Sequence, residues 1–212
     1  MTVPRFKRCT WLGSMSFLLF LLCLPASGFA EEHPLGISLA FRYAGLTGDE
    51  ESGVKWSDLY DNGIGGSLEI SYRTNPAVAI LGGIAYDQFA GTDITLCCPV
   101  ITGKFNDQNP LTFYVGAKFY ILQMAGPAKN PADPYLRLDL GLTRFDKLEF
   151  EGITVGDPVT KSSWDVGVGV DVPLSPLAAF FVELKYQDYG KPDQAGDTLR
   201  AYPISVGIRY SP

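Results

Sequence analysis

The segment over residues 163–172 constrains the fold most, because its side chains alternate strictly between two kinds. Four valines alternate with aspartate and glycine: Val166, Val168, Val170 and Val172 against Asp165, Gly167, Gly169 and Asp171. A period of two belongs to a β-strand, whose successive side chains point to opposite faces. The segment therefore predicts a strand with one apolar face and one small or charged face.

Further segments alternate in the same way, with large aliphatic and aromatic residues on one face and glycine, serine or charged residues on the other. They span residues 37–43, 66–73, 78–87, 112–121, 136–143, 180–186 and 201–210. Eight such strands are typical of an all-β fold, the eight-stranded antiparallel up-and-down transmembrane β-barrel. Leu81 departs from the alternation of its segment, which indicates a β-bulge beside Gly82.

The connections between these segments differ in length in a regular way. Long polar connections cover residues 47–64, 91–110, 149–161 and 190–199, short ones cover 74–77 and 173–176, and an intermediate one covers 123–134. Long loops at one end and short turns at the other are the arrangement of outer-membrane barrels, in which the short turns face the periplasm. We therefore expect both chain termini on the periplasmic side.

Residues 1–30 have the three parts of a cleaved export signal: a basic start, an apolar run over residues 17–24, and small residues before the cleavage position. The apolar run is about half of the roughly 20 residues that a membrane-spanning helix needs, which argues against a helical anchor. We predict cleavage ahead of Glu31, so that residues 31–212 form one barrel domain.

The charge of the mature chain excludes some partners. Removal of residues 1–30 takes away three of the 17 basic residues and none of the 23 acidic ones, which leaves a net charge of −9. Nucleic-acid binding needs the opposite sign, so we expect no nucleic acid as a partner. The acidic run Asp49–Glu51 in the first long loop is either a solvated charge cluster or an attractor of divalent cations or basic partners.

The face that points to lipid follows from volume and charge, since alternation alone also fits a soluble barrel that binds a ligand. An eight-stranded barrel has an interior only just wide enough for side chains or one small ligand, so the face rich in small residues belongs inside. That face also carries six basic and six acidic residues, which can be buried only as pairs. We expect a lumen packed with ion pairs, without an open pore, formed by Arg42, Glu69, Arg73, Asp87, Lys118, Arg137, Asp139, Asp165, Asp171, Glu183, Lys185 and Arg209.

Aromatic residues near the ends of the predicted strands would form the belts that contact the membrane interfaces. They are Tyr43, Tyr72, Tyr86, Trp164, Tyr186 and Tyr210.

Few residues of the chain could carry catalysis. The only histidine is His33, at the predicted mature N-terminus, so a serine or cysteine triad on the barrel would have no imidazole base. Cys97 and Cys98 are adjacent in a predicted loop and lack the spacing and number of ligands of a zinc site. They form a disulfide with each other, pair with another chain, or remain free thiols. We expect no metal, no cofactor and no catalytic residue.

The chain resembles the small outer-membrane β-barrel superfamily, which includes the transmembrane domain of outer-membrane protein A and outer-membrane proteins X and W. The resemblance covers nearly all of the mature chain and is carried by the signal, the eight strands, the segment over residues 181–190 and the final segment over residues 202–210. It implies contact with outer-membrane lipids and lipopolysaccharide, and with the outer-membrane assembly machinery during insertion. It says little about activity.

These observations favour a non-enzymatic integral protein of the bacterial outer membrane, with a structural role or a role in surface interactions through its loops. A partner for the loops cannot be named from the residues. A narrow pore for ions or small solutes and a soluble, exported, ligand-binding barrel are the alternatives, and an enzyme that modifies lipid A is the least favoured.

Overall fold

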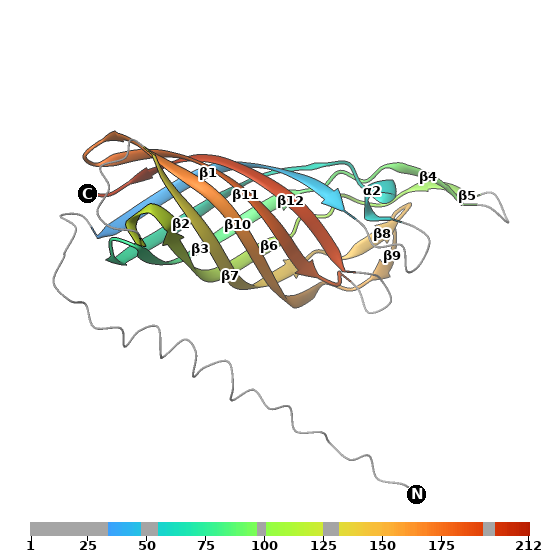
Figure 1. Ribbon diagram of the computed structural model, residues 1–212. Coiled ribbons are helices and arrows are strands. Elements are labelled where there is room, and N and C mark those ends of the chain that lie inside the picture. Colours follow the sequence, from blue (N-terminus) through green and yellow to red (C-terminus); the bar gives the residue numbers. More distant parts are fainter. Residues whose placement is uncertain (1–33, 48–54, 97–100, 125–131, 193–197) are drawn as a thin grey trace, which may run out of the picture.

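The protein is a closed antiparallel β-barrel of eight strands (Figure 1), as predicted. The structure is a computed structural model that describes residues 34–47, 55–96, 101–124, 132–192 and 198–212. The barrel strands follow the order β1-β12-β11-β10-β7-β6-β3-β2, and pairing of β1 with β12 closes the sheet. The strands are β1 (Leu35–Thr47), β2 (Gly63–Asn75), β3 (Val78–Gln88), β6 (Leu111–Tyr120), β7 (Asp133–Phe145), β10 (Val159–Ser175), β11 (Ala178–Gly190) and β12 (Leu199–Tyr210).

The two ends of the barrel differ, and we call them the turn end and the loop end. The turn end carries the short connections after β2 and β10, the helical turn α3 (Ile121–Met124), and the C-terminus. The loop end carries α2 (Trp56–Leu59) and two small hairpins, β4 (Asp93–Leu96) with β5 (Ile101–Lys104), and β8 (Leu148–Phe150) with β9 (Ile153–Gly156). Two of the connections predicted as loops, 91–110 and 149–161, therefore contain strands.

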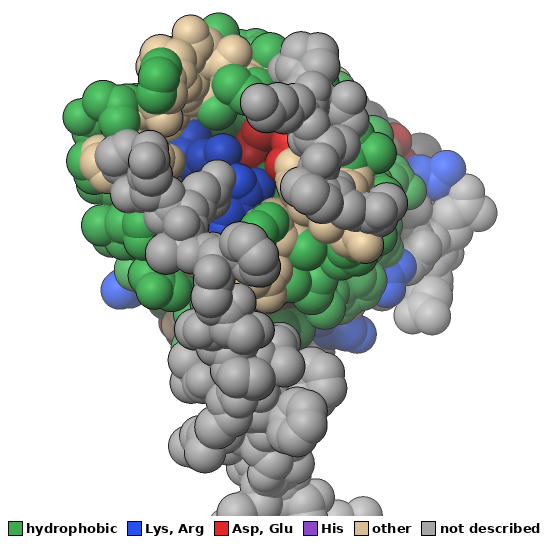
Figure 2. All heavy atoms as spheres, turned by 60° about the vertical axis from the view of Figure 1, so that its left-hand side comes forward, with side chains coloured by type: hydrophobic (Ala, Val, Ile, Leu, Met, Phe, Trp, Pro, Cys, Tyr) green, Lys and Arg blue, Asp and Glu red, His purple; other side chains and the backbone are tan. Residues whose placement is uncertain are grey.

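Most large apolar residues of the barrel strands point outward, and most of their charged residues point inward. On the outer face Leu39 is 67% exposed and Leu140 is 55% exposed, whereas Arg42 and Asp139 in the interior are at most 2% exposed. Figure 2 shows apolar side chains around the wall and charged side chains gathered within the hollow at the turn end. A soluble protein places most of its large apolar side chains inside, so this distribution is the one expected of a barrel surrounded by lipid.

Most strand boundaries lie outside the predicted ones, and two local predictions were wrong. The register of β3 with β2 and β6 is continuous around Leu81, so no bulge lies beside Gly82. Leu81 instead points inward and packs with Ala85 and Tyr114 as an apolar part of the lumen. Ile121 does not continue β6 but begins α3.

Inward glycines make room for large side chains on the neighbouring strand. Gly116 is the register partner of Asp139, and a Cβ atom at Gly116 would lie 1.9 Å from Asp139 Oδ1. Gly169 is the partner of Tyr135, and a Cβ atom there would lie 2.4 Å from the Tyr135 ring. Since real atoms cannot approach so closely, a glycine opposite a large residue is what lets this narrow lumen hold charged and aromatic side chains.

The aromatic residues predicted at the membrane interfaces lie on the outer face. Tyr43, Tyr72, Tyr86, Trp164 and Tyr210 are exposed, and Tyr186 packs between Trp164 and Tyr202, with ring centroids 5.6 and 5.4 Å away. Among the described residues, no helix has the length and apolar character to cross a bilayer.

Candidate functional site

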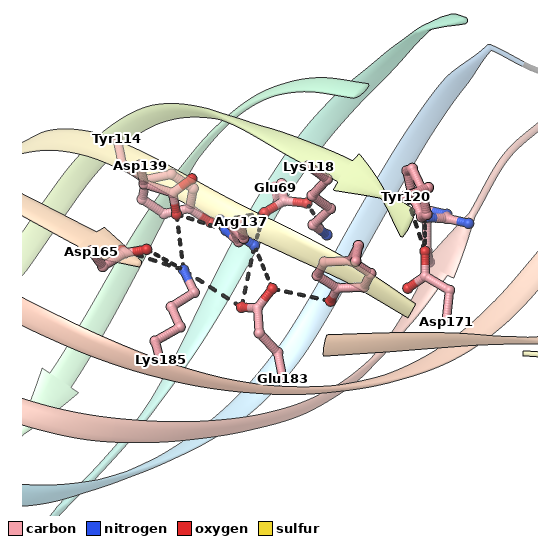
Figure 3. A network of polar contacts seen from close by, with 12 residues as sticks. Glu69, Tyr114, Lys118, Tyr120, Arg137, Asp139, Asp165, Asp171, Glu183 and Lys185 are labelled. Carbon is pink, nitrogen blue, oxygen red and sulfur yellow. Dashed lines mark hydrogen bonds and ion pairs between the residues drawn. The ribbon is translucent and has the colours of Figure 1, made fainter. Parts of the chain in front are cut away.

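The lumen contains three layers of polar contacts, which we describe from the middle outward. The central layer is built around Arg137 of β7, whose guanidinium contacts three carboxylates (Figure 3). Its Nη1 lies 2.7 Å from Oε2 of Glu69 and 3.1 Å from Oε2 of Glu183, and its Nε donates to Oδ2 of Asp139 at 2.7 Å. One cation therefore joins three strands across the barrel.

Two lysines complete the central layer. Nζ of Lys185 lies 2.9 Å from Oδ2 of Asp139 and 3.3 Å from Oδ1 of Asp165, and Nζ of Lys118 lies 3.0 Å from Oε1 of Glu69. Four carboxylates thus surround three cations, and the short distances repay part of the cost of removing these charges from water.

Two tyrosines fill the space between the charged groups of the central layer. The Tyr135 hydroxyl donates to Oε2 of Glu183 at 3.0 Å, and the Tyr114 hydroxyl donates to Oε2 of Glu69 at 3.4 Å. Every member of the layer is at most 6% exposed. The nine members are Glu69, Tyr114, Lys118, Tyr135, Arg137, Asp139, Asp165, Glu183 and Lys185.

At the loop end, an Arg–Asp pair lies beneath an apolar cluster. Nε of Arg42 lies 3.1 Å from Oδ1 of Asp87, and the Tyr189 hydroxyl donates to Oδ2 of Asp87 at 2.8 Å. Nη2 of Arg42 donates to Oε1 of Gln187 at 2.6 Å. The cluster, which we call the loop-end plug, consists of Ala44, Trp56, Tyr60, Phe89, Phe145, Tyr189, Leu199 and Ala201. It closes the barrel on this side with side chains from the strands and from α2.

At the turn end the lumen contains a cavity of about 310 Å³, which we call the turn-end cavity. Nη2 of Arg73 lies 3.3 Å from Oδ2 of Asp133, and its guanidinium carbon lies 3.9 Å from the centre of the Tyr120 ring. Arg209 donates to Oδ2 of Asp171 and, at 2.8 Å, to the Tyr120 hydroxyl oxygen. None of the residues that line this cavity belongs to the central layer.

The structure places all twelve predicted lumen residues on the inner face, and each of them takes part in an ion pair. They do not form one network, because the pairs separate into the three layers. Ten are buried, and Arg73 and Arg209 are half-buried beside the turn-end cavity.

Several polar side chains of the lumen lay outside the predicted strands. Asp133 lay in a predicted connection, and Tyr135 lay one residue before its predicted strand, although both share the odd numbering of Arg137 and Asp139. Continuing the alternation backward from Arg137 would have found them. Tyr189 also lay beyond its predicted strand and has the odd numbering of its inward residues.

Several predictions fall outside the described residues: the signal peptide over residues 1–30, His33, the acidic run Asp49–Glu51, and the pair Cys97 and Cys98. Within the part of the chain that the structure describes, no group of three or more histidine, cysteine, aspartate or glutamate side chains is arranged to hold a metal ion.

Known proteins share this architecture. Residues 16–211 match the family model described as outer membrane protein beta-barrel domain. The chain belongs to this outer-membrane β-barrel family. Among curated proteins, none matches the chain.

Solved barrels of the family superpose on the chain over most of their length. The attachment invasion locus protein Ail of Yersinia pestis is 19% identical, with a TM-score of 0.54 over 84% of this chain and 98% of Ail. Neisserial surface protein A is 15% identical, with a TM-score of 0.54 over 84% and 97%, and the outer membrane protein OprG of Pseudomonas aeruginosa is 15% identical, with a TM-score of 0.58 over 85% and 96%. At these identities the likeness establishes the fold.

Family membership places this outer-membrane barrel in a Gram-negative outer membrane, with its apolar face against lipid. The alternative of a soluble exported barrel was therefore wrong, and the physical reason is the outward apolar face. Short turns face the periplasm in such barrels, so we assign the turn end to the periplasm and the loop end to the cell exterior.

Proposed function

We propose that this outer-membrane barrel is a closed, non-enzymatic scaffold that presents a structured surface outside the cell. The observation that carries the proposal is the central layer, whose nine buried side chains come from five of the eight barrel strands, β2, β6, β7, β10 and β11. A solute that crossed this layer would have to separate buried charges that lie about 3 Å apart. The loop-end plug adds a second, apolar barrier.

The surface at the loop end is held together by hydrogen bonds between its connections. Phe105 and Phe150 form a β-bridge, and their rings pack at a tilt of 59° with centroids 5.1 Å apart. The backbone N–H of Asn106 donates to the backbone carbonyl of Glu149 at 3.0 Å, and the backbone N–H of Glu151 donates to the backbone carbonyl of Lys104 at 3.1 Å. The two hairpins therefore form one connected platform, and such order favours a partner that binds a preformed surface.

The charge of the described loop-end residues favours a basic or neutral partner. The described loop-end residues 55–62, 89–96, 101–110, 146–158, 191–192 and 198 contain four lysines and eight acidic residues. Ail has been crystallised in complex with the heparin analogue sucrose octasulfate. A polyanion of that kind would be repelled by the acidic surface here, because like charges across an interface oppose binding.

The ion pairs of the central layer argue against a catalytic role for the lumen. The carboxylates of the central layer are occupied by Arg137, Lys118 and Lys185, and they are buried from both ends of the barrel. A general acid or base must reach a substrate within hydrogen-bond distance, and no lipid could do so here.

The test uses the full mature protein folded into proteoliposomes. If the barrel is closed, we expect no ion conductance in planar bilayers. If the loop end binds a basic partner, we expect salt-sensitive binding of polylysine to the loop end and no binding of heparin. Replacement of Glu149 and Glu151 by glutamine should weaken polylysine binding, whereas replacement of Asp188, on the outer wall, by asparagine should not. Stepwise conductance by the unmodified protein would establish the narrow pore in place of the scaffold. Heparin binding would overturn the partner assignment.

A further inference from the structure

The charges of the lumen balance in two of its three layers but not in the central layer. At the loop end one arginine is paired with one aspartate, and at the turn end two arginines are paired with two aspartates. The central layer contains four carboxylates and three cations, so it would carry a net charge of −1 if every group were ionised. An uncompensated charge is strongly disfavoured at such a buried site.

Two of the four carboxylates face each other on neighbouring strands. Asp139 of β7 and Asp165 of β10, which we call the aspartate pair, are register partners that both point into the lumen. Nζ of Lys185 lies 2.9 Å from Oδ2 of Asp139 and 3.3 Å from Oδ1 of Asp165 (Figure 3). The two carboxyl groups also lie within hydrogen-bonding reach of each other. Two ionised carboxylates at this separation repel each other, whereas one proton between them forms an O–H···O hydrogen bond.

The contacts of the aspartate pair indicate which of its members remains ionised. Oδ2 of Asp139 accepts from Nε of Arg137 at 2.7 Å and from Nζ of Lys185 at 2.9 Å. Asp165 contacts the same Lys185 at longer distances, 3.3 Å from Oδ1 and 3.4 Å from Oδ2. Two close cations stabilise a negative charge on Asp139 better than one more distant cation does on Asp165. Asp165 is therefore the member that holds a proton at the lower cost.

The charged groups around the aspartate pair do not supply the missing positive charge. Arg137 and Lys185 also contact the glutamates of the layer, and Arg42 of β1, which faces Asp165, is paired with Asp87 of β3 at 3.1 Å. A further metal ion would be repelled by these cations, so a proton is the charge that restores the balance. The other titratable groups that face the pair are acidic or are neutral at neutral pH: Glu69 of β2, Tyr114 of β6, and Glu183 and Tyr189 of β11.

We propose that the aspartate pair holds one shared proton at neutral pH, with Asp165 as the protonated group that donates to the Asp139 carboxylate. An aspartate of the unfolded chain is ionised above about pH 5, so folding of the barrel takes up one proton, whatever the loop end binds. Stability then falls as the pH rises, because the unfolded state binds fewer protons than the folded state. One proton corresponds to a fall of about tenfold in the folding equilibrium constant for each pH unit, until the folded pair itself loses the proton.

The first experiment compares the full mature protein with Asp165→Asn by urea titration in phospholipid vesicles. Asparagine has the shape of a protonated aspartate and can donate to Asp139, but it takes up no proton on folding. Between about pH 5 and pH 6.5 the folding equilibrium constant of the unmodified protein should fall by up to about tenfold more per pH unit than that of Asp165→Asn. The control Asp157→Asn alters an exposed aspartate at the loop end and should keep the pH dependence of the unmodified protein. Asp139→Asn should lower the constant at least about tenfold more than Asp165→Asn, because it removes the acceptor of two cations.

The second experiment observes the proton directly and does not depend on the folding of a variant. The infrared spectrum of the unmodified protein at neutral pH should contain the C=O stretch of a protonated carboxyl group, and carbon-13 labelling of the aspartate carboxyl groups should move that band. The band should be absent from Asp165→Asn and present in Asp157→Asn. The proposal is overturned if the unmodified protein has no such band, if the band persists in Asp165→Asn, or if the unmodified protein and Asp165→Asn have the same pH dependence. Equal destabilisation by Asp165→Asn and Asp139→Asn would also overturn it.

Discussion

The two ends of the lumen contain the same three kinds of residue in opposite settings. At the loop end Arg42, Asp87 and Tyr189 form a bonded group that is at most 2% exposed. At the turn end Arg209, Asp171 and Tyr120 form an equivalent group that borders the turn-end cavity. The two groups differ at the arginine, because Arg42 is 2% exposed whereas the Arg209 side chain is 17% exposed at the cavity.

The volume of the neighbouring inward residues explains this difference. Next to the loop-end group lie the rings of Phe89 and Phe145, which fill the barrel. Around the turn-end group lie small inward residues of the surrounding strands, such as Gly36, Ser71 and Ala79. The number of strands fixes the width of the barrel, but the size of the side chains at each end decides whether that end is open.

The largest expected effect comes from the central layer, which separates the two ends. Arg137→Met leaves Glu69, Asp139 and Glu183 buried with fewer cations, and loss of one partner of a buried pair costs about 3 to 5 kcal/mol. We expect this loss in the free energy of unfolding, measured by urea titration in phospholipid vesicles with tryptophan fluorescence and mobility of unboiled samples on gels.

The control for this change is Lys147→Met, which breaks an ion pair whose lysine is 57% exposed in the loop-end platform. Exposed pairs contribute about 0 to 1 kcal/mol, so the control should unfold nearly as the unmodified protein does. Equal stability of both variants would mean that water enters the central layer and that the two ends are not separated by it.

A smaller effect should distinguish the two ends directly. Tyr189→Phe removes the donor to the buried carboxylate of Asp87, which should cost about 1 to 3 kcal/mol. Tyr120→Phe removes the donor to Asp171 and the acceptor for Arg209, but the Arg209 side chain is 17% exposed at the turn-end cavity, where water can replace these contacts, so the cost should be below about 1 kcal/mol. The two variants differ from the unmodified protein by one hydroxyl each, and the same unfolding experiment measures both.

The order of these two costs is what matters. If Tyr120→Phe destabilises the protein as much as Tyr189→Phe does, water in the turn-end cavity does not replace the lost contacts, and the two ends do not differ in this respect.

Much of this fold was predictable from the sequence, for a specific physical reason. Alternation marks both faces of every strand, so the twelve charged lumen residues could be named without coordinates. The ends of the strands could not be predicted. Asp133, Tyr135 and Tyr189 continue the alternation beyond the apolar runs that define a strand in the sequence. The two small hairpins lie in polar segments whose pairing depends on contacts such as the packing of Phe105 against Phe150.

The partners of each ion pair within the lumen also could not be predicted from the sequence. Which acid meets Arg137 depends on the register between strands and on the tilt of the barrel, and alternation contains neither. Glycine was read only as a small residue on the inner face. Its position opposite a large partner, as with Gly116 and Asp139, appears only once the register is known.

The smallest expected effect concerns the exposed pair in the platform, at the opposite extreme from the buried central layer. A hydrogen bond from the Lys147 ammonium, whose Nζ lies 2.6 Å from Oε1 of Glu149, holds the pKa of the Glu149 carboxyl below its usual value. A lowered pKa means that the contact stabilises the folded hairpin above the usual pKa of a glutamate, and that this stabilisation is lost as the pH falls through the lowered value.

We expect a carboxyl titration followed by NMR to show this lowered pKa for Glu149, and Lys147→Met to return it toward the usual value without a change in barrel unfolding. High salt should have the same effect as the substitution, because the pair is exposed to solvent. If neither Lys147→Met nor high salt alters the pKa of Glu149, contacts other than the ion pair lower that pKa. The platform would then be more rigid than its exposed ion pair implies.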